Sequence, residues 1–325
     1  MTAALVDYLL FAAKVATLFL LLGLLLVALA RARRGHRVDG DRLEVLDLNE
    51  KYRNMARALQ HASLPKKAIR KLTKSDRRAE KARKKAPAGE GRRRVFVVDF
   101  HGDIKATEVA GLRELVTAIL MEASPKDEVL VRLDNAGGVV TEHGLAASQL
   151  ARVRARDIPL TVAVDKVAAS GGYLMACVAS KIIAAPFAAV GSIGVVAQLP
   201  NFHRLLERSG VDFELHTAGE YKRTLTLFGE NTEAGREKLR QQLEDTHGLF
   251  KGFIQEYRPQ VDLAKVATGE YWYGARALAL GLVDEVRTSD DYLMAASEDA
   301  DVLLLTYTAH KRPLERLLSS LGAAG

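Results

Sequence analysis

The stretch that decides the fold is Lys166–Val196, KVAASGGYLMACVASKIIAAPFAAVGSIGVV. An apolar run typical of a buried strand, Pro159–Asp165, leads into it, and a helix-like stretch, Tyr173–Ala179, follows a turn of small residues. Ser170 therefore stands where a predicted strand gives way to a predicted helix. At such a point in an α/β fold, unpaired first-turn N–H groups can stabilise an anion. Serine is also a favoured helix cap, so the local pattern leaves a purely structural role equally open.

Length and composition allow a large core and give no sign of a cofactor. The chain has 325 residues and a formal net charge of +7, which suggests about two domains, or one domain with appendages. Cys177 is the one cysteine, so no intrachain disulfide forms, and its apolar neighbours indicate a packing role. The sequence contains no C-x-x-C, no H-E-x-x-H and no phosphate-binding G-x-x-x-x-G-K-[ST] loop. We therefore predict no metal and no cofactor.

The amino end has the pattern of a membrane anchor. Tyr8–Ala30 is apolar apart from Lys14, and about 20 such residues span a bilayer core. A cleaved signal peptide would carry basic residues before the apolar run, whereas here they follow it and Met1–Ala13 has no Lys or Arg. We predict a retained transmembrane anchor over residues 1–30, with residues 8–30 in contact with lipid. The positive-inside rule then places the rest of the chain in the cytoplasm.

Residues 31–94 form a strongly basic segment. They hold 22 Lys and Arg against 8 Asp and Glu, a net +14, so the rest of the chain is near −7. Leu43–Leu59 has helical spacing of apolar residues, and Pro87-Ala88-Gly89 reads as a linker. We predict a juxtamembrane arm that lies against anionic lipid headgroups, with a solvated linker as the alternative. No interleaved aromatic residues support nucleic-acid binding, and none is expected.

Strand-like and helix-like runs alternate after residue 94, which predicts an α/β domain over residues 95–288 with a parallel sheet. A C-terminal extension over residues 289–325 carries a further strand and a basic end helix, and is a candidate oligomer contact. The predicted strands are Val95–Phe100, Glu128–Asp134, Leu160–Asp165, Lys181–Ala185, Asp212–Thr217 and Val302–Thr306. The predicted helices are Glu108–Ala123, His143–Arg156 and Thr232–Tyr257, and Trp272–Val286 reads as a short helix followed by a strand.

Two features near Ser170 point to chemistry. The consecutive glycines Gly137 and Gly138 end a predicted strand, where their backbone N–H groups can serve as an oxyanion hole; a plain tight turn is the alternative. A serine hydroxyl also needs a base to accept its proton. Three histidines come nearest, and each fits a surface or structural role better: His143, His203 and His216.

Lysine is the other possible base, provided that it is neutral. The free pKa of a lysine side chain is about 10.4. Burial beside apolar groups can lower it by about 3 pH units, at a cost of about 4 kcal/mol. Lys222 is a candidate because it lies in a glycine-flanked turn after a predicted strand. Lys166 and Lys181 are its competitors, and the residues alone do not choose among the three.

Three motifs, in this order and spacing, resemble the signal peptide peptidase A family of Ser–Lys serine peptidases. They are Val167–Tyr173, the run Gly191-Ser192-Ile193-Gly194-Val195, and Gly219-Glu220-Tyr221-Lys222. The similarity extends from the apolar amino end to about residue 295.

The resemblance implies a ClpP/crotonase-like α/β fold of repeated ββα units and a serine endopeptidase of the inner membrane. By position, Ser170 is the nucleophile, Lys222 the general base and Ser192 the residue that orients the lysine. The N–H groups of Gly137 and Ser170 form the oxyanion hole, and Gly138, Gly171 and Tyr221 line the site. The resemblance also implies a homo-oligomeric ring in which serine and lysine can come from neighbouring protomers. The expected substrates are small or hydrophobic peptides such as signal-peptide remnants.

The glycine turn departs from the family pattern. The family usually has Ser-Pro-Gly-Gly, and this chain has Asn135-Ala136-Gly137-Gly138, so the turn lacks the rigidity of proline. This departure motivates an alternative, a catalytically weak membrane-tethered scaffold that binds peptides. A crotonase-type acyl-CoA enzyme shares the implied fold but needs no Ser–Lys pair. The family works on the outer side of the membrane, whereas the positive-inside rule favours the cytoplasm, so the side stays open.

Overall fold

The computed structural model describes residues 10–11, 13–23, 42–84 and 92–308. Residues 43–307 form one compact unit. Of the remaining chain, residues 10–11 and 13–23 are helical, and the other described residues, Arg42 and Thr308, are end residues of strands. No helix among the described residues is both long and apolar enough to cross a membrane. The predicted anchor over residues 8–30 and the predicted basic end helix extend outside the described residues.

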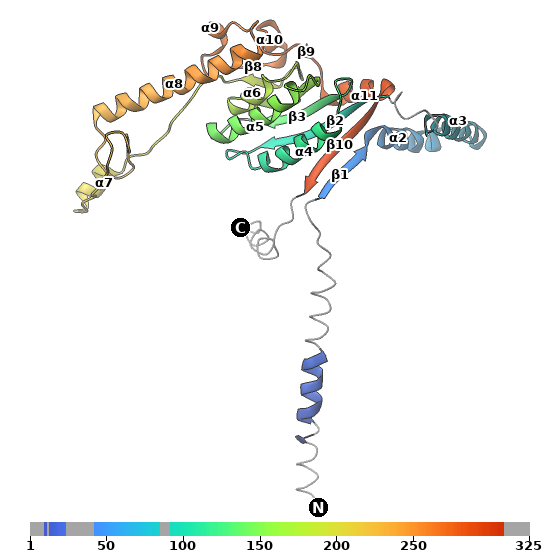
Figure 1. The fold of residues 1–325 in the computed structure, drawn as a ribbon, viewed down its shortest axis with the longest axis horizontal. Helices are drawn as coiled ribbons and strands as arrows, with labels where there is room; N and C mark the ends of the chain where they lie inside the picture. Colours follow the sequence, from blue (N-terminus) through green and yellow to red (C-terminus); the bar gives the residue numbers. More distant parts are fainter. Residues whose placement is uncertain (1–9, 12, 24–41, 85–91, 309–325) are drawn as a thin grey trace, which may run out of the picture. The chain divides into compact units, whose positions relative to one another are not determined.

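The unit has an α/β fold with a mixed β-sheet at its centre (Figure 1). Its main path runs β1-β10-β2-β3-β4-β6-β9, and every pair from β10 to β9 is parallel. A branch leaves β3: β5 pairs with β3 and β7 in parallel, and β7 pairs with β8 antiparallel. The strands are β1 Arg42–Asp47, β2 Arg93–Gly102, β3 Glu128–Asn135, β4 Leu160–Val164, β5 Val167–Ala169, β6 Lys181–Ala184, β7 Ala189–Gly191, β8 Tyr271–Tyr273, β9 Glu285–Val286 and β10 Ala300–Thr308.

Helices cover both faces of the sheet. Phe96, Val98 and Phe100 of β2 pack in the same core as α4 and α5, whereas Val95 and Val97 face α11 and the start of α2. This burial on both sides explains why β2 is a continuous apolar run rather than an alternating one. The helices are α2 Leu48–Ser63, α3 Lys66–Lys84, α4 Val109–Glu122, α5 Val140–Arg154, α6 Gly171–Ala176, α7 His203–Arg208, α8 Glu233–Tyr257, α9 Leu263–Val266, α10 Gly274–Ala279 and α11 Ser289–Asp299.

Most predicted elements are confirmed to within a few residues, and two are wrong. Asp212–Thr217, predicted as a strand, has no regular structure, because no strand in the described part of the chain pairs with it. The predicted helix Leu43–Leu59 begins only at Leu48, since Arg42–Asp47 is the edge strand β1. The alternation of apolar and polar residues in RLEVLD has the period of a strand.

The compact unit is larger than the predicted domain over residues 95–288, because it includes α2, α11 and β10. Asn49, near the start of α2, is buried and ties these elements together. Its amide nitrogen donates to the carbonyls of Ser297 and Ala300, and its oxygen accepts from the Val302 N–H. Part of the predicted arm over residues 31–94 and part of the extension over residues 289–325 therefore belong to the folded domain.

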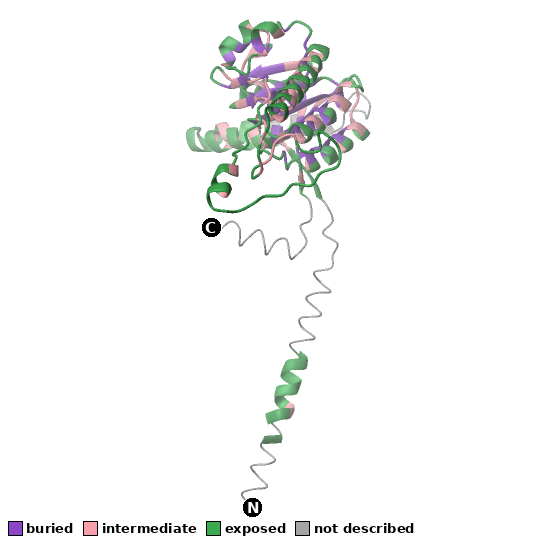
Figure 2. Cartoon of the chain, turned by 90° about the vertical axis from the view of Figure 1, so that its left-hand side faces the viewer, coloured by how far each residue is buried: buried purple, intermediate pink, exposed green. Residues whose placement is uncertain are grey.

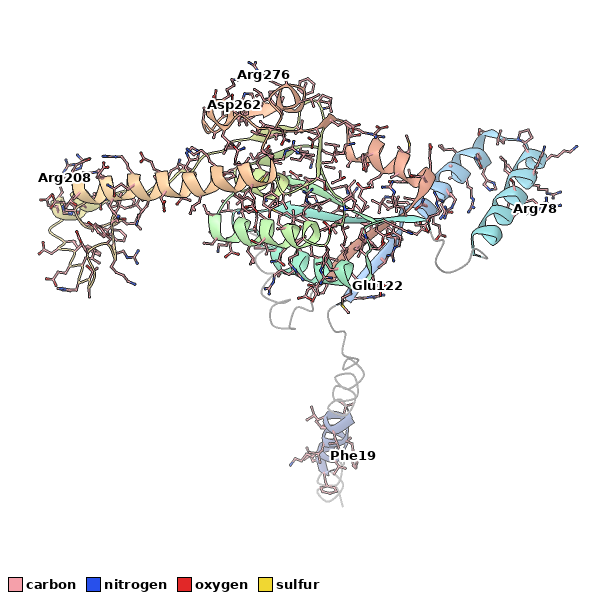
Figure 3. The ribbon with its side chains drawn as sticks, turned by 45° about the horizontal axis from the view of Figure 1, so that its top comes forward. Phe19, Arg78, Glu122, Arg208, Asp262 and Arg276 are labelled. Atoms are coloured by element: carbon pink, nitrogen blue, oxygen red, sulfur yellow. The ribbon has the colours of Figure 1, made fainter. Side chains whose placement is uncertain are left out.

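One segment projects from the domain. Residues 197–232, which we call the α7 arm, lead away from the domain, and α7 lies beside the outer end of α8 (Figure 1), where Arg208 is labelled in Figure 3. α8 begins at the Thr232 cap, whose hydroxyl accepts from the Gly235 N–H, and only Ile254 of its residues is buried. Figure 2 shows the contrast: buried residues concentrate in the sheet and its covering helices, and the arm is exposed.

Candidate active site

Ser170 occupies the predicted junction in a strained backbone conformation. It follows β5, precedes α6 and has φ 52° and ψ −120°. A positive φ in a residue other than glycine costs about 1–3 kcal/mol and is concentrated at functional sites. Ser170 is not a side-chain cap of α6, because its hydroxyl makes no capping hydrogen bond. The structure therefore favours a functional over a capping role.

Glycines let three backbone segments meet at Ser170. A Cβ on Gly137, whose φ is +94°, would lie 2.7 Å from the Ser170 Cβ and 2.9 Å from the Gly171 nitrogen. A Cβ on Gly172 would lie 2.1 Å from the Asn135 carbonyl oxygen. Real Cβ atoms do not approach other atoms this closely, so a larger residue would push the segments apart. The glycine turn after β3 is thus packed directly against the serine.

The N–H groups of both predicted oxyanion-hole residues are hydrogen-bonded within the chain. The Ser170 N–H donates to the Gly191 carbonyl at 2.8 Å, and the Gly137 N–H donates to Asn135 Oδ1 at 2.8 Å. The next residue in each case, Gly138 and Gly171, has an N–H with no acceptor among the described residues. Gly171 is the first residue of α6, where an N–H has no partner within its own helix.

The predicted Ser192 lies in the same cleft as Ser170. It follows β7, whose last residue Gly191 pairs with Ala169, and it also has a positive φ of 51°. A cleft of about 630 Å³ is lined by both serines together with Gly137 and Gly138. The structure thus brings the predicted nucleophile, the predicted orienting serine and the glycine turn together.

His247 also lines this cleft, and the sequence reasoning missed it. Its Nε2 is buried and has no hydrogen-bond partner among the described residues. An unpaired buried nitrogen is costly, so a cleft-side histidine of this kind suits a bound ligand. His247 reaches the cleft through its position in α8, and no local sequence motif marks it.

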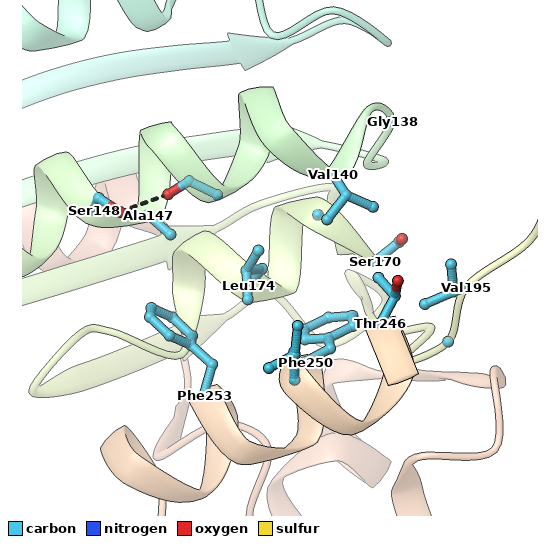
Figure 4. Close-up of a pocket in the computed structure, with 14 residues that line it drawn as sticks. Gly138, Val140, Ala147, Ser148, Ser170, Leu174, Val195, Thr246, Phe250 and Phe253 are labelled. Atoms are coloured by element: carbon cyan, nitrogen blue, oxygen red, sulfur yellow. Dashed lines mark hydrogen bonds between the residues drawn. The ribbon is translucent and has the colours of Figure 1, made fainter. Parts of the chain in front are cut away.

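An apolar pocket of about 320 Å³ opens beside Ser170 (Figure 4). It lies between α5, α6 and α8, and Thr246 and Val195 stand close to the serine at its mouth. The apolar side chains that line it are Val140, Leu174, Val195, Leu249, Phe250 and Phe253. The pocket shares Gly138, Gly194 and Val195 with the polar cleft, so an apolar group bound here would place its neighbouring backbone at Ser170.

Tyr173 anchors α6, the helix behind the pocket, in the core. The fully buried Tyr173 donates its hydroxyl to the Leu282 carbonyl at 3.0 Å. Burial raises the pKa of Tyr173, so the hydroxyl stays a donor. Burial likewise raises the pKa of the Cys177 thiol, which disfavours the reactive thiolate. Cys177 is fully buried in the core, as predicted for a packing residue.

Lys222 and Tyr221 lie in the α7 arm, away from this cleft. Lys238, near the start of α8, places its Nζ 4.7 Å from the Tyr221 ring centroid. Thr246 at the Ser170 pocket follows eight residues later, and eight helical residues span about 12 Å. Both predicted residues are exposed. Within one chain, the structure does not bring Lys222 to Ser170.

The competing bases have other roles. Lys166 Nζ pairs with Asp134 at 3.1 Å, and Lys181 Nζ pairs with Glu285 at 2.6 Å. His143 is buried below the glycine turn, whereas His203 and His216 belong to the α7 arm. No group of three or more His, Cys, Asp or Glu in the described part of the chain could hold a metal ion.

Comparison with known proteins identifies the family. Two family models match: peptidase family S49 N-terminal over residues 3–150, and peptidase family S49 over residues 152–303. The chain is 45% identical over 322 residues to "Probable protease SohB" of Haemophilus influenzae, covering 96% of this chain and 91% of that protein. The chain belongs to peptidase family S49. A second "Probable protease SohB", from Buchnera aphidicola subsp. Acyrthosiphon pisum, is 54% identical over 230 residues, 71% of this chain and 68% of that protein.

The S49 assignment confirms the resemblance read from the three motifs and makes this chain a peptidase. The two S49 models meet between residues 150 and 152, inside α5, so the division does not coincide with a structural boundary. Among solved structures, a lysine-to-alanine mutant of the 1510-N membrane-bound stomatin-specific protease with a substrate peptide has 14% identity and a TM-score of 0.43. The match covers 71% of this chain and 98% of that one.

Proposed function

We propose that this S49 peptidase is a membrane-anchored serine endopeptidase with Ser170 as nucleophile and Lys222 as general base. One observation carries the proposal. Ser170 is held in a strained conformation at the mouth of an apolar pocket, beside Gly138 and Gly171, whose N–H groups have no acceptor among the described residues. For the α/β domain as a whole, we propose a ClpP/crotonase-like fold of ββα units.

The chemistry is acyl transfer through an ester intermediate. Ser170 Oγ adds to the scissile carbonyl carbon while its proton passes to the neutral Lys222 amine. The carbonyl oxygen becomes an oxyanion, which the N–H groups of Gly138 and Gly171 stabilise. The C–N bond then breaks, and the leaving amine takes the proton from the Lys222 ammonium. Water repeats the sequence on the ester, releasing a carboxylic acid and restoring the Ser170 hydroxyl.

The lysine must come from a second copy of the chain, because the α7 arm keeps Lys222 away from its own Ser170. The arm presents apolar side chains that a monomer leaves exposed, among them Leu205, which is 61% exposed. Within the arm, Phe228 packs against Phe202 and Phe213. An arm with its own small cluster and an exposed apolar surface suits docking on a neighbour. In a closed ring of copies, each Ser170 would receive Lys222 from a neighbouring chain.

Docking would also prepare the amine for its role. A docked arm would exclude water from the cleft, and desolvation disfavours the charged form of an amine. Ser192 would be placed to hydrogen-bond the incoming nitrogen. The arm also brings Tyr221 to the cleft rim. The homo-oligomer is therefore part of the catalytic machinery.

The pocket defines the substrate class. Its apolar lining and volume fit small or medium hydrophobic side chains, which suits hydrophobic peptides such as signal-peptide remnants. A membrane anchor over residues 8–30, with the basic arm on anionic headgroups, would hold the peptidase at the inner membrane near such substrates. The side of the membrane is left open in this proposal.

An activated-serine probe tests the proposal directly. The full chain, in detergent or membranes, is incubated with a fluorophosphonate, and adducts are located by mass spectrometry alongside cleavage of a fluorogenic hydrophobic peptide. We expect the adduct on Ser170 and loss of cleavage in Ser170→Ala and Lys222→Ala. Lys126→Ala, an exposed lysine in the loop before β3, should retain full activity. Peptide binding without adduct or cleavage would instead establish the peptide-binding scaffold.

A further inference from the structure

Asn135, the last residue of β3, has a buried side chain next to the glycine turn. It is 1% exposed. Its Cγ would lie 2.2 Å from a Cβ on Gly102, the residue opposite it in β2, so the amide packs against the neighbouring strand. A buried amide without partners costs about 1–3 kcal/mol. The buried Asn135 amide therefore needs hydrogen-bond partners, and those partners indicate its role.

The amide oxygen holds the glycine turn. Oδ1 accepts the Gly137 N–H at 2.8 Å, and Nδ2 faces the Met175 sulfur at 3.3 Å. A backbone N–H can only donate, so this contact sets the orientation of the amide with its oxygen toward the turn. Asparagine thus closes a local turn with the residue two positions on.

His143 extends the contact to the other side of the site. Its Nε2 lies 3.2 Å from the same Asn135 Oδ1, and its Nδ1 lies 2.9 Å from the Val139 carbonyl oxygen. The ring is fully buried, and a Cβ on Gly171 would lie 2.5 Å from its Cγ. One imidazole therefore touches both the residue that holds Gly137 and the first residue of α6.

We infer that Asn135 and His143 are positioning residues that set the two oxyanion-hole donors. The inference rests on the proposed function. Asn135 holds Gly137 and so places the following N–H of Gly138, while the His143 ring supports the backbone of Gly171. In the family's usual Ser-Pro-Gly-Gly, proline restricts the turn. Here a hydrogen-bonded amide and a buried ring restrict it from the side.

Two substitutions at one position separate the hydrogen bond from packing. Asn135→Leu keeps a similar volume but removes the acceptor, and Asn135→Asp keeps an oxygen facing Gly137 and His143. We expect Asn135→Leu to lower kcat and the rate of fluorophosphonate labelling at Ser170 about 100-fold, because a donor displaced by about 1 Å loses that much. KM should stay within about threefold, and Asn135→Asp should stay within about tenfold of wild type in kcat. His143→Gln should lower kcat about tenfold.

Gln149→Leu is the matched control. Gln149 is also a buried amide, on α5, and it accepts a hydrogen bond from Arg152 away from the glycine turn. This variant should lose stability without losing kcat. A peptide aldehyde, which forms an oxyanion on Ser170, should bind more weakly to Asn135→Leu in step with kcat, while the product peptide acid binds equally.

Several results would overturn the inference. Equal losses in Asn135→Leu and Asn135→Asp would do so, as would losses that follow the melting temperature across all four variants. If Asn135→Leu does not fold, the comparison of His143→Gln with Gln149→Leu decides, and equal kcat in those two rejects the positioning role. A wild-type protein that gives no adduct at Ser170 would instead reject the proposed function itself.

Discussion

Gly137→Ala is the most informative single substitution, because it adds one carbon atom at the most crowded point of the site. The native φ of +94° is a conformation that an alanine rarely adopts, and it costs about 1–3 kcal/mol. The new Cβ would also lie 2.7 Å from the Ser170 Cβ and 2.9 Å from both the Ala169 oxygen and the Gly171 nitrogen. Two of these three neighbours are backbone atoms, which cannot rotate away.

The contact distances set the expected loss of kcat and of stability. Ordinary contact at a Cβ begins at 3.4 Å, so the turn and the serine must separate by roughly 1 Å. A displacement of about 1 Å at a catalytic group lowers kcat about 100-fold. Strain and overpacking together destabilise the fold by about 2–6 kcal/mol, against a typical domain stability of about 5–15 kcal/mol. The variant should therefore remain folded and be nearly inactive.

Initial rates on a fluorogenic hydrophobic peptide give kcat and KM, and circular dichroism gives the melting temperature. Gly248→Ala in α8 is the control, because a Cβ at that position would meet no neighbouring element within 4 Å and alanine favours a helix by about 1 kcal/mol. It should keep full activity and melt slightly higher. If folded Gly137→Ala retains kcat within about threefold of wild type, the close packing of the glycine turn on Ser170 does not matter for catalysis.

Three further predictions concern the pocket, the arm and the fold. Val140→Phe, which narrows the apolar pocket, should reduce kcat/KM for substrates with large side chains about 10- to 100-fold relative to alanine substrates; equal effects on both would show that this pocket does not select the substrate. Phe228→Asp in the α7 arm should shift the protein to smaller species in light scattering and abolish cleavage, whereas Met121→Asp, also an exposed apolar residue, should do neither. Burial of the Asp127 carboxyl opposes its ionisation, but hydrogen bonds from Arg94 and Ser124 outweigh this effect and hold its pKa well below the usual range. Asp127 therefore stabilises the fold above the unfolded pKa of about 4, and that contribution is lost as pH falls below it. Asp127→Asn should lower the free energy of unfolding at pH 7 by about 2 kcal/mol and flatten its acid-side pH dependence in urea titrations.

The core of the fold was predictable because it depends on local patterns. The apolar run of β2 and the helical spacing of α4 and α8 each specify an element without reference to the rest of the chain. The prediction of a strand at Asp212–Thr217 was wrong because a strand also needs a neighbouring strand, and the α7 arm contains none. β1 is hidden in the sequence because Leu43 and Leu46 also fit the helical spacing that continues into α2.

The spatial grouping of the candidate site residues was also predictable in part. Ser170, Ser192 and the glycine turn sit at strand ends that the parallel sheet brings together, so sequence order sufficed to group them. The N–H groups of Gly137 and Ser170, predicted to form the oxyanion hole, donate instead to Asn135 and to the Gly191 carbonyl, which is why we propose the N–H groups of Gly138 and Gly171 as donors. His247 and the buried contact between Asn135 and His143 join residues from different elements, and no local pattern marks them.

The central claim is that each site combines Ser170 of one chain with Lys222 of another, and subunit mixing tests it most directly. Ser170→Ala and Lys222→Ala chains, each inactive alone, are dissociated, mixed in equal amounts and reassembled. Random mixing in a ring gives about a quarter of the sites an intact serine beside an intact lysine, so we predict recovery of about a quarter of wild-type peptide cleavage. If verified mixed assemblies stay inactive while a wild-type sample treated in the same way recovers, the two residues do not meet across chains and the account is contradicted.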